Sequence, residues 1–471
     1  MILCIDCGLT NGKLLLFSET GDCLGKTSFT TPLSHTLIDT HQLRELLYGE
    51  LQELLRNIPV PAQQISCITV SGHGNGLYLI GEEDVLPIGY SSMVTESAGQ
   101  LPPPSQTCPI ILQSDWAGQP LPILSWIKQT KPEIYAQAKT VLFCKDLLRW
   151  FLTGTAVTEE TDASAAGLLN AHTGQYDIDL LRIYDLEDAR TKLPIVFRSD
   201  SCAGMVTQEV SEQTGLPAGI PVLGGLFDVN SCMLGSGVID SGTYSIIAGT
   251  WGINAAPSLS LVQSERITQC CRFYGSSPYV CIDSAPTSCS NLEWFSQTVL
   301  GNMSYEEVNR LVEAEPEDEE LIYLPYLYPP MDLPRAQGGF VGLKPHHGAG
   351  SMLRAVFEGI VLEHRYRIEK LRQAGIVADN AVLSGGASNS LAFAQMFADV
   401  CGIPFSILMQ SEAGALGGAI LGLTASGVYP NLNAAVQALV QYKATIAPNA
   451  QRKDYYDRKY RKFRSIQEQW Q

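Results

Sequence analysis

The stretch VLGGLFDVNSCMLGSG, residues 222–237, lies near the middle of the chain and sets the interpretation of the rest. An apolar run that begins at Ile220 carries Gly224 and Gly225 and then reaches an acid, Asp228. The residues that follow the acid are small and compatible with a helix, and this pattern ends at glycines. The order predicts a buried strand, a tight turn, a carboxylate and a helix.

Asp228 has two interpretations. A carboxylate at the end of a buried strand, beside glycines that let a ligand approach the backbone, is well placed to act as a general base. An Asp at this point of a chain also commonly caps the helix that follows it. The other motifs of the chain favour the general base.

Length and charge restrict the classes of protein to consider. The 471 residues are too many for one core, so we expect two domains of roughly 200 or more residues each. Hydrophobic residues make up 45% and charged residues 17%, which is ordinary for a globular α/β protein. The net charge of -17 repels phosphate backbones, so nucleic acid and anionic membranes are poor partners.

The chain shows no sign of export or membrane insertion. Only four residues separate Met1 from the first acid, which leaves no room for a signal peptide, and no run of 18 apolar residues occurs. The 13 cysteines are scattered, mostly in apolar runs, as in a reduced cytoplasmic protein. Cys4 and Cys7 have redox spacing but lie on an expected strand, and the adjacent Cys270 and Cys271 are too close for a metal pair.

Two polar turns in the first quarter of the chain follow expected strands. Strands over 2–5 and 13–17 enclose the turn at residues 6–12, which can offer backbone N–H groups and a hydroxyl to a phosphate, with Asp6 placed to hold a metal. A strand over 65–70 ends in a loop, residues 71–76, where three glycines surround His73 and Asn75 and suit a hydroxyl-rich ligand. The alternatives are a plain hairpin turn and a structural histidine.

The second half of the chain also begins with a strand that ends in a Gly/Thr turn. A strand over 244–248 ends in Gly249-Thr250, which echoes the turn near Gly8, and indicates a duplicated domain with the ligand cleft between the copies. A second glycine turn, Gly385-Gly386, precedes a helix over 391–399 and can offer backbone N–H groups to a nucleotide. Helices are also expected over 41–57, 121–128, 145–152, 352–373 and 454–469, and over the small-residue segment 412–419, where we expect close helix packing.

Together, these turns resemble the FGGY carbohydrate kinases, members of the actin-like ATPase superfold, over nearly the whole chain. The opening hairpin of the family, Asp-x-Gly-Thr-x-x-x-Lys, corresponds to residues 6–13, with Leu9 where Thr is usual. Further matches are the sugar loop at 71–76, Leu-Thr-Gly at 152–154, the base Asp228, Gly249-Thr250, the adenosine loop at 385–389 and Glu-Ala-x-Ala-Leu-Gly at 412–417. The Gly-x-Phe-x-Gly-Leu signature occurs at 338–343, although Ser351 replaces the polar residue usual before the next helix.

The resemblance implies an α/β fold of two actin-like, ribonuclease-H-like domains with a ligand cleft between them. Residues 1–237 correspond to the sugar-binding, catalytic domain and 238–471 to the nucleotide-binding domain. The implied reaction is ATP-dependent phosphorylation of a terminal hydroxyl of a small ketose, with Mg²⁺ as cofactor and a homodimer as the default assembly. Strings such as residues 224–229 and 249–251 resemble the L-xylulose kinase branch of the family.

The resemblance also implies a role for each matched residue. Asp228 accepts the proton of the acceptor hydroxyl, and Asp6 holds Mg²⁺. The residues expected around the phosphates are Gly8, Thr10, Asn11, Lys13, Gly249 and Thr250, and those around the adenosine are Gly385, Gly386 and Asn389. The sugar side is assigned to His73, Asn75, Glu96 and Trp116.

One departure leaves the acceptor open. Relatives commonly carry an Asp-Arg pair where this chain reads Glu96-Ser97, and the loss of an Arg alters a polar wall of the sugar pocket. The alternatives are another ketopentose, a pentitol or tetritol, or a sugar acid. Two rivals from other classes are a catalytically silent sugar-binding regulator and an actin-fold phosphatase, although the chain shows neither a damaged base nor a basic channel.

Overall fold

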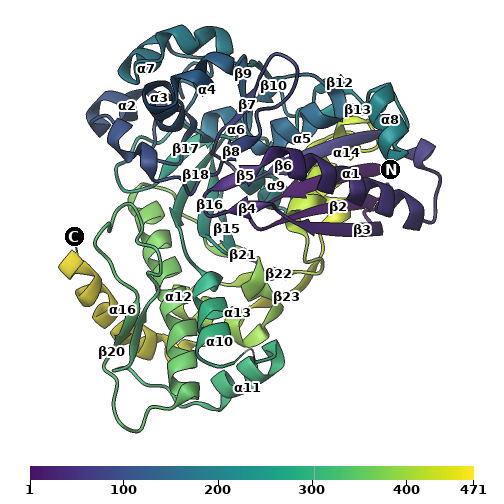
Figure 1. The fold of residues 1–471 in the computed structure, drawn as a ribbon. Helices are drawn as coiled ribbons and strands as arrows, with labels where there is room; N and C mark the ends of the chain where they lie inside the picture. The colour runs from purple at the N-terminus through teal and green to yellow at the C-terminus, as the bar shows by residue number, and fades with distance from the viewer. Residues whose placement is uncertain (302, 471) are drawn as a thin grey trace.

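Two seven-stranded sheets, each with helices beside it, form the framework of the molecule (Figure 1). The computed structural model describes residues 1–301 and 303–470. One sheet is built from the first half of the chain and the other from the second half. In Figure 1 the first-half elements occupy the upper part of the view, and α12, α13 and α16 surround the lower part.

The N-terminal sheet has the strand order β12-β13-β6-β1-β2-β3, with β14 paired to β6. The first three strands run antiparallel to their neighbours in sequence, whereas β6 and β13 lie parallel to β1. The edge strand β12 is antiparallel to β13. The bounds of these strands are Ile2–Cys7 (β1), Asn11–Phe17 (β2), Cys23–Thr30 (β3), Cys67–Gly72 (β6), Cys202–Met205 (β12), Pro221–Leu223 (β13) and Leu226–Phe227 (β14).

The C-terminal sheet repeats this plan, in the order β17-β18-β16-β15-β21-β22-β23. Its β18-β16-β15-β21-β22 part has the same sequence of antiparallel and parallel neighbours as β3-β2-β1-β6-β13. This common order confirms the expected duplication. The strands are Thr243–Ala248 (β15), Gly252–Ser258 (β16), Gln269–Arg272 (β17), Tyr279–Ala285 (β18), Asn380–Ser384 (β21), Phe405–Leu408 (β22) and Tyr442–Ile446 (β23).

The helices expected from apolar periodicity are present, with ends shifted by a few residues. In α1, Leu43, Leu47, Leu51 and Leu54 are buried, and the side chain of Asp39 caps the N-terminus by accepting a hydrogen bond from Gln42 N. The corresponding bounds are Thr40–Asn57 (α1), Pro120–Thr130 (α3), Cys144–Thr153 (α5), Ala349–Gln373 (α12), Leu391–Cys401 (α13), Ala413–Ala425 (α14) and Lys453–Gln467 (α16).

Shorter elements complete the two halves. The small strands are Leu33–Ser34 (β4), Leu37–Asp39 (β5), Tyr78–Ile80 (β7), Ile88–Tyr90 (β8), Thr140–Leu142 (β9), Val157–Glu159 (β10), Ile195–Phe197 (β11), Ile322–Leu324 (β19) and Gly339–Val341 (β20). The remaining α-helices are Pro104–Ile111 (α2), Pro132–Gln137 (α4), Glu160–Ala165 (α6), Ile178–Ile183 (α7), Gln208–Thr214 (α8), Asp228–Gly235 (α9), Cys289–Thr298 (α10), Tyr305–Ala314 (α11) and Leu432–Leu439 (α15).

The central stretch folds in the expected order, with one addition. β13 ends before the glycine pair, and a second short strand, β14, follows the pair and precedes α9. Gly225 has a φ of 83°, and a Cβ there would overlap the Val70 carbonyl oxygen of β6, so only glycine fits. The turn therefore offsets the chain within the sheet, and Asp228 becomes the first residue of α9.

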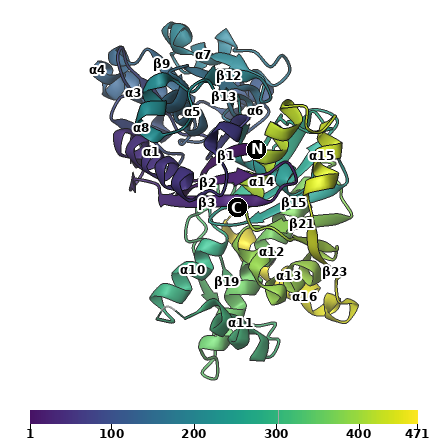
Figure 2. The ribbon, with the colours of Figure 1, turned by 90° about the vertical axis from the view of Figure 1, so that its right-hand side faces the viewer.

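Helix α14 belongs to the second half of the chain but packs on the first. A Cβ at Gly417 would overlap the Ser231 carbonyl oxygen of α9, and a Cβ at Gly235 would overlap the Ala413 carbonyl oxygen. Gly418 and Gly422 lie against side chains of β1 and β6. Figure 2 shows α14 close to β1, in agreement with these contacts. The expected close packing of this small-residue helix is confirmed.

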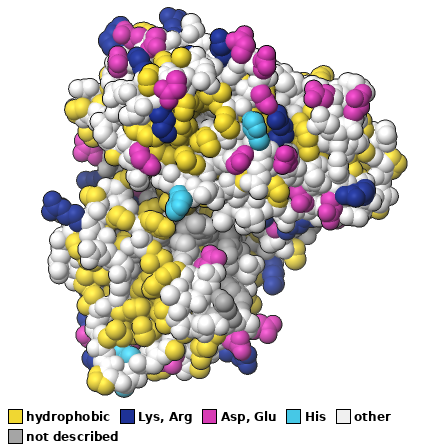
Figure 3. Space-filling model, in the orientation of Figure 1, with side chains coloured by type: hydrophobic (Ala, Val, Ile, Leu, Met, Phe, Trp, Pro, Cys, Tyr) yellow, Lys and Arg dark blue, Asp and Glu magenta, His cyan; other side chains and the backbone are white. Residues whose placement is uncertain are grey.

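The surface agrees with the acidic composition. On the face in Figure 3, acidic side chains are scattered among Lys and Arg, which do not gather into a patch there. Within the described part of the chain, no helix is both long and apolar enough to cross a bilayer.

Candidate active site

A cavity of about 360 Å³ lies between the two halves of the chain. Its wall takes residues from the β1–β2 turn, the loop after β6, the start of α9, the β15–β16 turn and strands β17 and β18. It thus brings together turns that are up to 240 residues apart, from Thr10 to Thr250. The expected residues in this wall are Asp6, Gly8, Thr10, Asn11, Lys13, His73, Asn75, Trp116, Asp228, Gly249 and Thr250.

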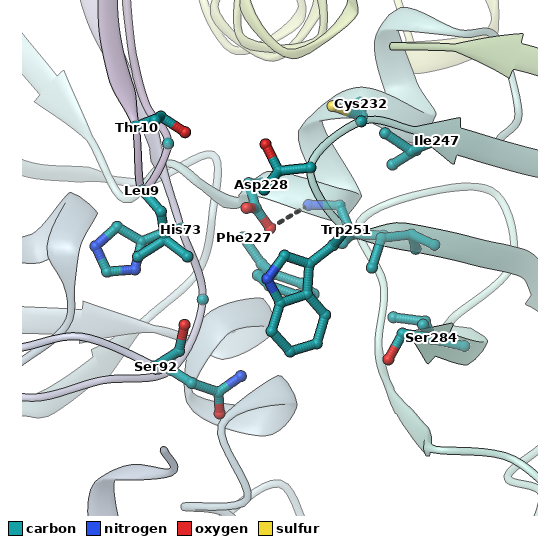
Figure 4. Close-up of a pocket in the computed structure, with 18 of the residues that line it drawn as sticks. Leu9, Thr10, His73, Ser92, Phe227, Asp228, Cys232, Ile247, Trp251 and Ser284 are labelled. Atoms are coloured by element: carbon teal, nitrogen blue, oxygen red, sulfur yellow. Dashed lines mark hydrogen bonds between the residues drawn. The ribbon is translucent and has the colours of Figure 1, made fainter. Parts of the chain in front are cut away.

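The carboxylate of Asp228 faces this cavity (Figure 4). Asp228 Oδ1 accepts a hydrogen bond from Val229 N at 2.7 Å, so the residue also satisfies an N–H group at the start of α9. No other hydrogen bond to this carboxylate occurs within the described residues. Burial, followed by the negative charge of Asp6, raises the pKa of Asp228 to about 7. A carboxylate with this pKa can accept a proton near neutral pH.

A buried polar network fixes the segment that leads to Asp228. Arg149 Nη1 donates to the Gly224 carbonyl oxygen at 2.6 Å, before the glycine turn. Phe227 N donates to Thr161 Oγ1 at 3.0 Å, after the turn. Thr161 Oγ1 in turn donates to Glu159 Oε1 at 2.6 Å. These partners come from α5, β10 and α6.

Asp6 lies at the end of β1, on the same cavity wall. Ser71 Oγ donates to Asp6 Oδ1 at 2.6 Å, and burial raises the pKa of the Asp6 carboxyl above its usual range. A Cβ at Gly414 would come within 2.5 Å of Asp6 Oδ2, so this glycine keeps the carboxylate accessible. Asp6 and Asp228 repel each other when both are ionised. A pair of carboxylates of this kind fits a hard divalent cation, which prefers oxygen ligands.

The expected phosphate turns lie on the cavity, but Lys13 is engaged elsewhere. Gly8, Thr10 and Asn11 line the wall from the β1–β2 turn. Lys13 also lines it, yet its Nζ forms an ion pair with Glu412 Oε2 at 2.7 Å. The ammonium group of Lys13 therefore links the β1–β2 turn to Glu412 in the second half of the chain.

The expected adenosine loop adjoins the β15–β16 turn outside the cavity wall. Gly385 has a φ of 83°, and a Cβ there would lie 2.6 Å from the Ala248 carbonyl oxygen and 3.1 Å from Gly249 N. Gly386 and Asn389 continue from it in a 3-10 turn, Gly386–Asn389. None of the three loop residues lines the cavity. The loop is in contact with the phosphate turn, as adjoining phosphate and adenosine sites require.

Two residues of the loop after β6 line the cavity, and each has a buried polar atom without a partner among the described residues. His73 Nε2 is hydrogen-bonded to Tyr78 OH at 2.9 Å, whereas His73 Nδ1 finds no partner among the described residues. Asn75 Oδ1 is likewise unpaired within the described part of the chain. Burial lowers the pKa of His73 to about 4, so its ring is neutral. Because buried polar groups are normally satisfied, these two atoms are suited to ligand hydroxyls.

The two remaining sugar-side candidates, Trp116 and Glu96, differ in their position relative to the cavity. Trp116 lines the cavity, whereas Glu96 is exposed and lies outside the cavity wall. Glu96 Oε2 accepts from Thr95 N at 3.0 Å, and Ser97 Oγ donates to the Ala117 carbonyl oxygen at 2.5 Å. The geometry therefore gives no support for a sugar contact by Glu96, because its side chain turns back on its own 3-10 turn, Glu96–Gln100.

Several wall residues were not identified from the sequence. Trp251 follows the Gly-Thr turn directly and was visible in the motif, although no role was assigned to it. Phe227, Cys232 and Ile247 lie in segments that the sequence marks, but no role was assigned to them. The others come from segments whose spacing carries no recognisable pattern, because only the fold brings them to the cavity. They are Ser92, Ile253, Thr268, Gln269, Ile282, Ser284 and Met331.

Comparison with known proteins identifies the family. Residues 1–235 match the model of the FGGY family of carbohydrate kinases, N-terminal domain, and residues 283–426 match that of the C-terminal domain. The chain belongs to the FGGY family of carbohydrate kinases. The predicted family and the predicted sugar kinase activity are thereby confirmed.

Related FGGY kinases match nearly end to end. The L-xylulose/3-keto-L-gulonate kinase of Escherichia coli is 30% identical over 438 residues, which cover 91% of this chain and 88% of the relative. The probable L-xylulose kinase of Haemophilus influenzae is 30% identical over 89% of this chain and 90% of the relative. The crystal structure of gluconate kinase from Lactobacillus acidophilus superposes with a TM-score of 0.89 at 22% identity, covering 99% and 97% of the two chains.

This agreement in fold confirms the predicted two-domain, actin-like α/β architecture. FGGY kinases use ATP, so the substrates of this enzyme are a sugar and ATP.

Proposed function

We propose that this FGGY kinase transfers the γ-phosphoryl group of ATP to a terminal hydroxyl of a small neutral ketose, and that L-xylulose is the first acceptor to test. The observation that carries the proposal is the cavity that Asp228, His73 and Asn75 line together, the last two each with a buried polar atom that has no partner among the described residues. Two relatives at 30% identity support this choice of sugar, one named L-xylulose/3-keto-L-gulonate kinase and the other probable L-xylulose kinase, although the first name also includes a sugar acid.

In this proposal Asp228 removes the proton of the attacking hydroxyl. The hydroxyl oxygen attacks the γ-phosphorus, the bond to the bridging oxygen breaks, and ADP leaves while the proton stays on the carboxyl group. General-base assistance of this kind contributes about 10²–10⁴-fold to the rate. His73 and Asn75 hold neighbouring hydroxyls, and Trp116 provides an apolar wall.

The phosphates and the cation have separate partners. The turns that contain Gly8 and Thr250 surround the transferred phosphate with N–H and hydroxyl groups, where catalysis is mainly positioning and charge stabilisation. Asp6 would hold Mg²⁺, which supplies positive charge for the phosphate oxygens when it is bound. Gly385, Gly386 and Asn389 lie beside the phosphate turn and would flank the adenosine.

The charge of the cavity favours a neutral acceptor over a sugar acid. Lys13 is the only Lys or Arg among the described wall residues, and it is paired with Glu412. Asp6 and Asp228 add negative charge to the same wall. A sugar carboxylate would therefore meet repulsion without a compensating cation, since a buried charge needs a partner.

Two features of the enzyme as a whole complete the proposal. We assign residues 1–237 to the sugar-binding, catalytic domain and 238–471 to the nucleotide-binding domain, which the two-sheet division supports. We place the enzyme in the cytoplasm, where its 13 free cysteines stay reduced. The family resemblance supports a homodimer, which size-exclusion chromatography with light scattering tests.

The decisive experiment measures ADP release by coupled assay across ketopentoses, pentitols, tetritols and sugar acids. We expect turnover on L-xylulose and at least a hundredfold loss in Asp228→Asn, with folding and ATP binding retained, because the variant keeps the shape and removes the base. Asp179→Asn, an exposed residue of α7, is the control and should retain full activity. A folded, ATP-binding protein without turnover on any acceptor contradicts the proposal and favours a silent sugar-binding regulator.

A further inference from the structure

Trp251 occupies a position in the cavity that the proposed mechanism does not use. It follows Thr250 in the β15–β16 turn, and its indole projects into the cavity beside Asp228 and Phe227 (Figure 4). The turn is firmly held, since Ser288 N donates to the Thr250 carbonyl oxygen at 3.0 Å and Ser290 Oγ donates to the same oxygen at 3.0 Å. The backbone that carries the indole of Trp251 is therefore held in place close to the proposed site of phosphoryl transfer.

Trp251 meets Trp116 across the cavity. The two ring centroids are 5.7 Å apart and the planes are inclined by 63°, an edge-on contact of the kind that aromatic pairs prefer. Trp116 belongs to the first half of the chain and Trp251 to the second. The pair thus bridges the two halves of the chain at the cavity wall.

The segment that carries Trp116 is tied to both halves. Gly76 N, in the loop with His73 and Asn75, donates to the Gly118 carbonyl oxygen at 2.9 Å. On the other side, Ser114 N donates to the Thr268 carbonyl oxygen at 3.1 Å, in the segment that leads into β17. These bonds hold the backbone that carries both indoles, and the ring contact places the two side chains together on the cavity wall.

We propose that Trp251 is a specificity-determining residue, whose contact with Trp116 limits the acceptor to short polyhydroxy chains of about five carbons and excludes water from the transferred phosphate. This inference rests on the proposed sugar kinase function. A cavity of about 360 Å³ lies near the lower end of the range for small-molecule sites, and the two indoles in contact take up part of the space a longer chain needs.

The test compares five- and six-carbon ketoses and ADP release without sugar in Trp251→Ala and Trp251→Phe. In Trp251→Ala we expect the kcat/KM ratio of six- to five-carbon acceptors to rise at least about tenfold, the effect of one or two carbons in a tight pocket. Sugar-independent ADP release should rise as well, because water enters. Trp251→Phe should restore most of the discrimination. Trp294→Ala, an indole of α10 that is 40% exposed and outside the cavity wall, is the matched control.

The outcomes separate this inference from the proposed function. An active enzyme whose acceptor ratio is unchanged in a folded Trp251→Ala overturns the role of Trp251 and leaves the kinase intact, because a merely structural residue lowers kcat/KM for all acceptors alike. If Trp251→Ala does not fold, Trp251→Leu is measured, and an unchanged ratio there has the same meaning. Absence of turnover by the unaltered enzyme on every acceptor contradicts the proposed function instead.

Discussion

At the scale of single residues, His364 shows how burial sets a charge. Its Nδ1 lies 2.8 Å from Asn254 Oδ1 and its Nε2 lies 2.9 Å from Ser288 Oγ, beneath the β15–β16 turn. Burial, followed by the positive charge of Arg367, lowers the pKa of His364 to about 3. The ring is therefore neutral in the folded enzyme at every pH near neutrality.

This pKa predicts an acid-dependent loss of stability. His364 has a pKa of about 6.5 in the unfolded chain, so below that pH the unfolded chain binds a proton at this residue and the folded chain does not. The free energy of unfolding therefore falls as pH falls from about 6.5 toward about 3. In His364→Gln the dependence of the free energy of unfolding on pH should weaken by about 1.4 kcal/mol per pH unit around pH 5. Urea titrations across this pH range measure it. His172→Gln, an exposed histidine, should leave the slope unchanged, and an unchanged slope in His364→Gln would contradict the prediction.

At the scale of elements, the turn between β13 and α9 depends on a hydroxyl from α6. Thr161→Val keeps the shape of the side chain but leaves Phe227 N without its acceptor. We expect a loss of about 1–3 kcal/mol in the free energy of unfolding, the cost of an unsatisfied buried N–H group. We also expect kcat to fall more than KM rises, since Asp228 follows Phe227. Thr130→Val, in which the lost hydroxyl is exposed at the end of α3, should change little in either measurement.

The contact between α9 and α14 gives a second prediction at this scale. In Gly417→Ala the new methyl group overlaps the Ser231 backbone, so the two helices must separate. Overpacking of this kind costs about 1–3 kcal/mol, and it should also lower kcat because α9 begins at Asp228. Thermal unfolding and the ADP assay measure both effects. The control is Gly49→Ala in α1, where the new methyl group has open space, so the free energy of unfolding should rise by about 0.5–1 kcal/mol. A Gly417→Ala variant with unchanged stability would disprove the close contact between α9 and α14.

At the scale of the whole molecule, Glu412 connects the two halves through two ion pairs. Lys13 Nζ and Lys26 Nζ lie 2.7 Å and 2.6 Å from its carboxylate oxygens. The side chains of Lys13 and Lys26 are 35% and 43% solvent-accessible, so water and salt weaken both ion pairs.

We therefore expect a small effect of Glu412→Gln on stability. The free energy of unfolding should fall by less than about 1 kcal/mol, and the difference should shrink as salt is raised. Urea unfolding at low and high ionic strength measures it, with the exposed pair partner Glu187→Gln as control. A loss of several kcal/mol would show that these pairs are effectively buried in solution.

Much of the fold could be predicted because its signals are local. The leucines of α1 recur with helical period, and glycine turns mark the ends of β1, β6, β15 and β21. The separate strand β14 could not be predicted, because two residues carry no period and their pairing with β6 is a long-range contact. Glu96 shows the same limit for the site, since its place in the chain says nothing about which way its side chain turns.

The sequence by itself determined the family, the two-domain architecture and the positions of the turns that line the cavity, because each rests on a short motif whose local conformation is dictated by glycines, polar caps and apolar period. Only the tertiary structure decided which side chains share one cavity. The pKa of Asp228, the unpaired atoms of His73 and Asn75, and the contact of Trp116 with Trp251 all arise from burial between the two halves. Burial depends on segments far apart in the chain, so no local pattern encodes it.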